Sequence, residues 1–163
     1  MLRHSSQLIC FVIFAILTSA AQNSKPAPVQ PGAEYSGMYY FLRDGEFVQI
    51  TVEDEGNVTG FVSRIGDSDT DRGAILDHFF KQGKLDGQKL TFSTKPVHGV
   101  WFEFRGTVER GDGKNAGDEA YYVLKGTLTE NLTDEAKKTT SHSREVGLKS
   151  FPQDMAPEVP TKK

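Results

Sequence analysis

The chain has 163 residues and carries 19 basic and 22 acidic side chains, which gives a net charge of −3 at pH 7. This balance, without clustered Lys and Arg, argues against nucleic acid or anionic lipid as the main partner. Cys10 is the only cysteine, so the sequence predicts neither a disulfide framework nor a thiolate metal site.

The first 21 residues have the order of a secretory signal peptide. A basic start at Arg3 is followed by an apolar run from Leu8 to Leu17 and then by small residues. The run is shorter than the ~20 residues of a membrane-spanning helix. We therefore expect cleavage near Ala21, no membrane span in the mature chain, and a secreted or periplasmic location. A secreted domain without disulfides is typical of a bacterial envelope.

The rest of the chain divides into a spacer, one domain and a tail. Residues 22–34 hold three prolines and little to bury, so they predict an extended spacer. Residues 35–151 contain all the strand-like segments. Residues 152–163 form a polar tail with further prolines, which predicts disorder.

Residues with a period of two, bounded by turn signals, predict about eight strands in this domain. The expected strands cover residues 37–43, 46–53, 57–64, 79–84, 88–94, 98–109, 119–130 and 144–151. Asp44-Gly45 joins the first two as a hairpin, because both residues tolerate positive φ. Residues 65–80 are expected to be the least regular part, with a helical turn or the start of a strand after residue 74. Residues 131–143 are expected to be irregular, with one possible helical turn.

A glycine recurs at the centre of three of these strands. Phe104-Arg-Gly106-Thr-Val108 is echoed around Gly126 and Gly60, each time between apolar residues of the inner face. Such glycines favour sharp bends or close backbone approach, as in a coiled sheet. The sequence therefore predicts an all-β single antiparallel meander that forms an up-and-down barrel, with a β-sandwich as the alternative.

The glycine-punctuated strands and the Val146-Gly-Leu-Lys-Ser-Phe151 ending resemble the avidin and lipocalin type of small barrel over residues 35–151. The resemblance implies a small up-and-down β-barrel. An avidin-like biotin site needs several tryptophans, and this chain has only Trp101. A lipocalin-like Gly-x-Trp opening is replaced by Gly37-Met-Tyr. Biotin binding is therefore not implied.

An acidic loop offers a candidate calcium site. Asp67, Asp69 and Asp71 have the alternating spacing with which a calcium loop begins. The glycine and glutamate that such a loop needs are replaced by Arg72 and His78. A solvated acidic loop is therefore favoured, and no metal or other cofactor is expected.

Catalytic chemistry has weak support in the sequence. Asp77, His78, His98 and Glu103 are residue types of a metal site, but the His-x-His pair of a cupin-like motif is absent. No nucleophile elbow of the Gly-x-Ser-x-Gly type is present either. A metal-dependent or hydrolytic envelope enzyme using His98, Glu103 and His78 is kept as the alternative function.

A mixed aromatic and polar face is the main functional signal. Alternation places six aromatic residues opposite the aliphatic face, namely Tyr39, Phe41, Phe47, Phe61, Trp101 and Tyr121. Such a surface is typical of a ligand pocket or a protein contact. The expected ligand-binding residues are Trp101, Glu103, Arg105, Tyr39, Phe61 and Tyr121. The leading hypothesis is a non-catalytic barrel that binds a small apolar or amphipathic ligand or an envelope partner.

Overall fold

The computed structural model describes residues 30–153, which form one sheet of eight antiparallel strands in meander order. The strands are β1 (Gly37–Tyr40), β2 (Phe47–Val52), β3 (Val58–Ile65), β4 (Ile75–Asp86), β5 (Lys89–Thr94), β6 (Val100–Arg110), β7 (Tyr122–Thr133) and β8 (Thr139–Lys149). Two short 3-10 turns, η1 (Ala33–Tyr35) and η2 (Asp54–Gly56), are the only helical elements of this part. The expected all-β meander is confirmed.

The predicted signal peptide lies outside the described residues, as do most of the spacer and most of the tail. The folded region nevertheless takes in short pieces of both flanks. η1 precedes β1, and the Gln153 N–H donates a hydrogen bond to the carbonyl of Gly117 over 2.8 Å.

The Asp44-Gly45 hairpin forms where the sequence predicts it. Gly45 has a φ of 83°, and Tyr40 pairs with Phe47 on the next strand. The register places Tyr39 opposite Val48, whose side chain is fully buried. This hairpin therefore decides which side of β1 faces inward.

Two segments expected to be irregular are strands. β4 is continuous over twelve residues and pairs with both β3 and β5, with a register shift between Phe80 and Gln82. β7 and β8 extend past residue 130 and form a long hairpin, whose turn at Asp134 is closed by the Lys137 N–H. Backbone hydrogen bonds to the neighbouring strands hold these polar segments extended. The alternation of residues within one segment does not reveal this pairing, so the sequence did not predict the strands.

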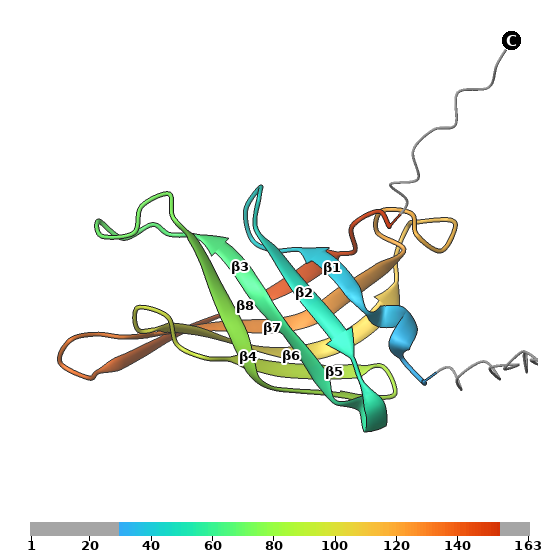
Figure 1. The fold of residues 1–163 in the computed structure, drawn as a ribbon, viewed down its shortest axis with the longest axis horizontal. Helices are drawn as coiled ribbons and strands as arrows, with labels where there is room; N and C mark the ends of the chain where they lie inside the picture. The colour runs from blue at the N-terminus through green and yellow to red at the C-terminus, as the bar shows by residue number, and fades with distance from the viewer. Residues whose placement is uncertain (1–29, 154–163) are drawn as a thin grey trace, which may run out of the picture.

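The sheet curls into a half-barrel that is joined at one place only. Tyr39 bridges Ser150, and the Phe151 N–H donates to the Met38 carbonyl over 2.8 Å. Elsewhere the β8 edge that faces away from β7 has no strand partner within residues 30–153. Figure 1 shows β1 to β4 passing in front of β5 to β8 as the sheet turns on itself. The molecule is one curled sheet and not a sandwich of two.

The core fills the inner face of this curl. Its most deeply buried members include Tyr39, Ile50, Leu90, Phe102, Phe104, Leu124 and Leu128. Phe92 stacks between Phe80 and Phe104, with ring centroids 4.5 and 5.3 Å apart. Burial of each large side chain contributes roughly 1.5–3 kcal/mol to folding.

The inner-face glycines are places of close backbone approach, as predicted. Gly106 and Gly126 are directly paired across β6 and β7. A Cβ on Gly106 would overlap the carbonyl oxygen of Lys125, and one on Gly126 would overlap that of Arg105. Only glycine fits both positions without a backbone shift.

Candidate functional site at the mouth of the half-barrel

Three of the predicted ligand-binding residues lie on the outer face of β6. Trp101, Glu103 and Arg105 alternate there with the buried Phe102 and Phe104, as expected. Glu103 and Arg105 border a hollow of about 270 Å³ whose rim also includes Lys84, Thr91 and Ser93. Trp101 does not line this hollow.

Tyr39 and Phe41 face the other way, which corrects the face assignment made from alternation. Tyr39 is 1% exposed, and its hydroxyl donates to the carbonyl of Tyr35 over 2.7 Å. Phe41 is buried edge-on against Phe102 at 5.3 Å. Alternation misplaced them because both sides of this short strand are apolar, and only pairing with Val48 decides between them.

The remaining two predicted residues lie elsewhere. Tyr121 precedes β7 and stacks under the guanidinium of Arg110, 3.4 Å from its ring centre. Phe61 is on the outer face of β3, beside Phe47 and Phe79. The six predicted residues therefore do not form one site.

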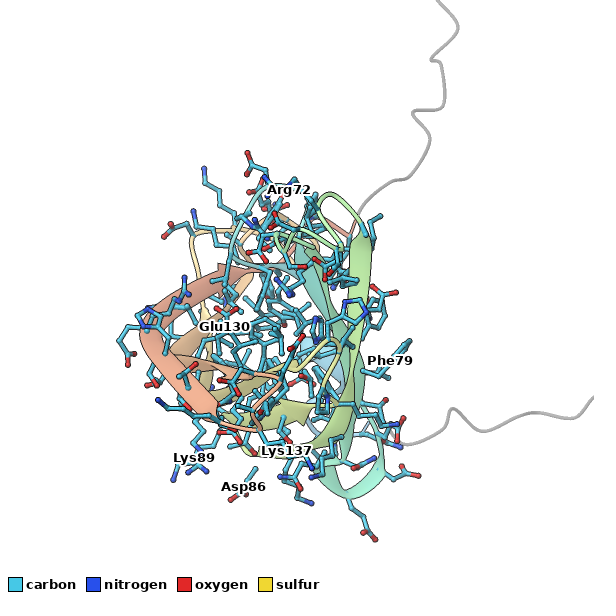
Figure 2. The ribbon with its side chains drawn as sticks, turned by 90° about the vertical axis from the view of Figure 1, so that its left-hand side faces the viewer. Arg72, Phe79, Asp86, Lys89, Glu130 and Lys137 are labelled. Carbon is cyan, nitrogen blue, oxygen red and sulfur yellow. The ribbon has the colours of Figure 1, made fainter. Side chains whose placement is uncertain are left out.

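A different set of side chains converges at the mouth, the end of the half-barrel where β1 meets β2, β3 meets β4, and β7 meets β8. A hollow of about 240 Å³ opens there, lined by Phe41, Leu42, Arg43, Glu46, Arg64, Asp67, Phe102, Glu130 and Arg144. Figure 2 looks onto this end and shows Glu130 pointing into the interior of the curl. The mouth therefore combines two aromatic rings with charges of both signs.

Arg64 is the most deeply held cation of the mouth. It is 7% exposed on the inner face of β3. Its Nε donates to Nε2 of the fully buried His78 over 3.2 Å, and Nη1 donates to Asp67 over 3.3 Å. Its Nη2 has no hydrogen-bond partner within the described residues, and Arg64 is one of the residues that line the hollow.

His78 holds Arg64 as a neutral acceptor. Burial first, and then the charge of Arg64, lower the pKa of His78 from 6.5 to about 4. Since Nε2 accepts from Arg64, the ring proton is on Nδ1, which has no hydrogen-bond partner in the part of the chain described. The backbone groups of Val100 and Lys95 lie near the ring and partly offset this lowering of its pKa. Neither makes a hydrogen bond of normal geometry to Nδ1.

The other charges of the mouth are paired. Glu46 is 2% exposed and receives Arg43 at 2.6 Å and the Ile65 N–H at 3.0 Å. Glu130 receives Arg144 at 3.3 Å. The mouth therefore presents three guanidinium groups and three carboxylates. Each of the three arginines keeps at least one N–H group without a protein partner among residues 30–153, but Arg43 and Arg144 are 48% and 40% exposed whereas Arg64 is 7% exposed.

The residues of the alternative enzyme hypothesis do not meet. His78 points inward and is buried, whereas Asp77 and Glu103 lie on outer positions of β4 and β6. His98 lies between β5 and β6, and its Nδ1 is 2.8 Å from Oδ2 of Asp71. Within residues 30–153 no group of three or more His, Cys, Asp or Glu could hold a metal ion.

The three carboxylates of the acidic loop have separate partners. Asp67 faces Arg64, and Asp69 pairs with Arg72 at 2.7 Å on the surface. Asp71 is 5% exposed and contacts His98, and it also accepts hydrogen bonds from the backbone N–H and the hydroxyl of Ser68. These contacts hold the loop in place and keep the three carboxylates apart.

The sequence did contain a signal for the mouth, although it was missed. Arg64 has the same parity as the inward Val62, Glu130 follows Leu128 in the same way, and Arg144 precedes Val146. A charged residue at an inward-facing position near the end of a strand indicates that the interior of the half-barrel is polar at that end. Such polar ends are where β-barrels commonly hold ligands.

The fold and this site define a curled, antiparallel half-barrel with a charged mouth. Comparison with protein-family models and with curated proteins finds no match for the chain. No helix in the described range is long and apolar enough to cross a membrane.

Proposed function

We propose that this protein is an exported, non-catalytic β-barrel that binds a small amphipathic carboxylate in its mouth. The observation that carries the proposal is Arg64: a buried guanidinium, fixed by His78 and Asp67, whose Nη2 has no partner in residues 30–153. A guanidinium in a partly dry site is a strong partner for a carboxylate oxygen. Phe41 and Phe102 supply an apolar wall for the body of the ligand.

The size and balance of the mouth support a small ligand. Its volume of about 240 Å³ lies below the ~300–1,000 Å³ typical of sites for drug-sized molecules. Glu130 and Glu46 offer acceptors close to the guanidinium groups. A ligand that carries a donor as well as a carboxylate therefore fits better than a purely apolar one.

The lining supports binding more than turnover. It consists of phenylalanine, leucine, arginine and carboxylate side chains, and each carboxylate is already held by an arginine. A nucleophile with an adjacent base, as covalent catalysis requires, is not part of this set.

Calorimetric titration tests the proposal with phenylacetate and its neutral amide as a matched pair. We expect the carboxylate to bind and to raise the melting temperature, and the amide to bind at least roughly tenfold more weakly. Arg64→Met should abolish the difference between the two. Arg72→Met removes an exposed surface arginine and serves as the control.

Arg64→Lys keeps the positive charge but loses the fork of donors, so it should retain part of the preference for the acid. It replaces Arg64→Met as the test variant when the neutral substitution prevents folding. Equal binding of acid and amide, or a preference unaffected at Arg64, would overturn the proposal. Native mass spectrometry of protein from its host cell would identify a retained ligand.

The outer face of β6 is the second candidate for ligand binding. Glu103 and Arg105 border the hollow of about 270 Å³ there, on the opposite side of the sheet from the mouth. Trp101 is on the same outer face, so a ligand at this face would change its emission. Separate substitutions of Arg105 and Arg64 distinguish the two candidates, because ligand binding is lost only when the arginine of the occupied site is replaced.

A further inference from the structure

A continuous row of aromatic rings crosses the outside of the first half of the sheet. This outer aromatic row consists of Tyr40, Phe47, Phe61, Phe79 and Phe151. Successive ring centroids are 4.1 Å apart for Tyr40 and Phe151, 6.3 Å for Phe151 and Phe47, 5.7 Å for Phe47 and Phe61, and 5.5 Å for Phe61 and Phe79. Figure 2 shows Phe79 projecting away from the sheet. Phe79 is 56% exposed and Tyr40 is 39% exposed, so both ends of the row reach solvent.

Three of the four strands under this row carry no charge on their outer face, whereas on β4 the exposed Asp77 and Lys81 lie on either side of Phe79. The outward positions of β1, β2 and β3 hold only aromatic, aliphatic and uncharged polar residues, including Met38, Gln49 and Thr51. The outward positions of β6, β7 and β8 instead carry charges of both signs, such as Glu103, Arg105, Lys125 and Glu145. Aromatic enrichment with loss of charge is the composition of an interface core and not of a solvated sheet face.

We propose that the outer aromatic row is the contact surface between two copies of this chain. In a two-fold dimer the same patch meets itself, so its two ends exchange partners. Phe79 of one copy then packs against Tyr40 and Phe151 of the other. The proposal is independent of the ligand site, because the mouth lies on the inner face.

The chemistry of the row favours a second copy over other partners. The chain has a net charge of −3, so two copies repel weakly, and the uncharged outer face of β1 to β3 brings no further like charges together where two copies would meet. Gln49 and Thr51 each hold donors and acceptors, and such groups can pair with their own copies. An anionic surface would select Lys or Arg, and the outward side of β1 to β3 has neither.

The angles between the rings disfavour a flat ligand. Neighbouring rings of the row are inclined at 44° to 70° to one another. A flat ligand that stacks on several of these rings at once would need their faces to be close to parallel. Inclined rings instead leave openings between them that edge-to-face packing with another set of rings can fill.

The area of the row predicts a weak dimer. The width of four strands spaced ~4.8 Å apart and the length of about six residues at ~3.3 Å each give a footprint on the order of 400 Å² per copy. The two copies together would bury about 800 Å², which is at the low end of the range for specific interfaces. We therefore expect a dimer that forms and dissociates in the micromolar range and not a permanent one.

Sedimentation velocity of the purified protein, from the micromolar to the submillimolar range, tests the proposal. The expected result is a reversible shift from monomer to dimer. Phe79→Glu should weaken this association by roughly tenfold or more. Thr91→Glu adds the same charge at an exposed position of β5 and should leave the dimer unchanged.

Gln49→Glu provides a second variant that keeps every ring. It is close to isosteric and brings a like charge from each copy to the contact, so it should also weaken the dimer. A monomer at all concentrations overturns the proposal, as does a dimer that both variants leave intact. Flotation of the monomer with neutral lipid vesicles that Phe79→Glu abolishes would assign the row to a membrane surface and overturn it too.

Discussion

Arg64 donates its Nε hydrogen to Nε2 of His78 over 3.2 Å, from the inner face of β3 to the inner face of β4. The two side chains are diagonal neighbours, because Val62 is the direct cross-strand partner of His78. This contact requires a neutral imidazole, since a protonated ring has no acceptor to offer.

Acidification should therefore destabilise the fold through His78. Its pKa is about 4 in the folded state, below the 6.5 of the free side chain, so the unfolded chain binds the proton more readily. Stability from this group is complete above pH 6.5 and is lost as the pH falls from there towards 4. The loss should reach roughly 1–3 kcal/mol, and urea unfolding at pH 7 and pH 4.5 measures it.

His78→Gln is the matched variant, because its amide oxygen can still accept from Arg64 without titrating. Its unfolding free energy should change less between these two pH values than that of the unsubstituted chain. An identical pH dependence in both proteins would contradict the assignment of a neutral, buried His78.

Gly106→Ala should destabilise the domain by about 1–3 kcal/mol, because the new Cβ would overlap the Lys125 carbonyl and force the paired strands apart. Gly147→Ala is the control, since its Cβ would meet only a methyl of Val123 at an ordinary 3.8 Å. Urea unfolding of both variants checks this. Equal stability of the two would mean that β6 and β7 can separate freely at Gly106.

Trp101 and Phe102 should differ sharply although they are adjacent. Phe102→Ala removes a ring that is 1% exposed and should cost about 3–5 kcal/mol. Trp101→Ala, on the half-buried outer face, should cost clearly less. Acrylamide should quench the emission of the single tryptophan, and an unquenchable, blue-shifted emission would place Trp101 in the core.

Asp71 and Asp69 should also behave differently, although both belong to the acidic loop. Asp71→Asn weakens the hydrogen bonds of a carboxylate that is 5% exposed to Ser68 and to His98, which is itself 60% exposed, so it should lower the melting temperature clearly. Asp69→Asn alters a pair on the surface and should cost under about 1 kcal/mol. Melting curves of the two variants test this difference.

Calcium should leave the melting temperature of the unsubstituted protein unchanged, because the three loop carboxylates already have separate protein partners. A bound ion at a hundredfold excess over its dissociation constant would stabilise the fold by about 2.7 kcal/mol. A calcium-dependent rise in melting temperature that Asp69→Asn removes would contradict this expectation.

The sequence by itself determined the class of fold and most of its local geometry. Alternation around Phe102 and Phe104, the Asp44-Gly45 turn and the paired Gly106 and Gly126 are local or periodic signals, and each is confirmed. Such features follow from side-chain period and turn chemistry, which act over a few residues.

Only the tertiary structure decided the features that depend on pairing between distant segments. β1 is apolar on both sides, so the inward position of Tyr39 follows from its register with Val48. β4 and the start of β8 are polar on exposed positions and are strands because neighbouring strands hold them. The mouth arises because curling brings Arg64 of β3 beside the hollow that Glu130 of β7 also lines, two residues far apart in sequence whose meeting no local pattern encodes.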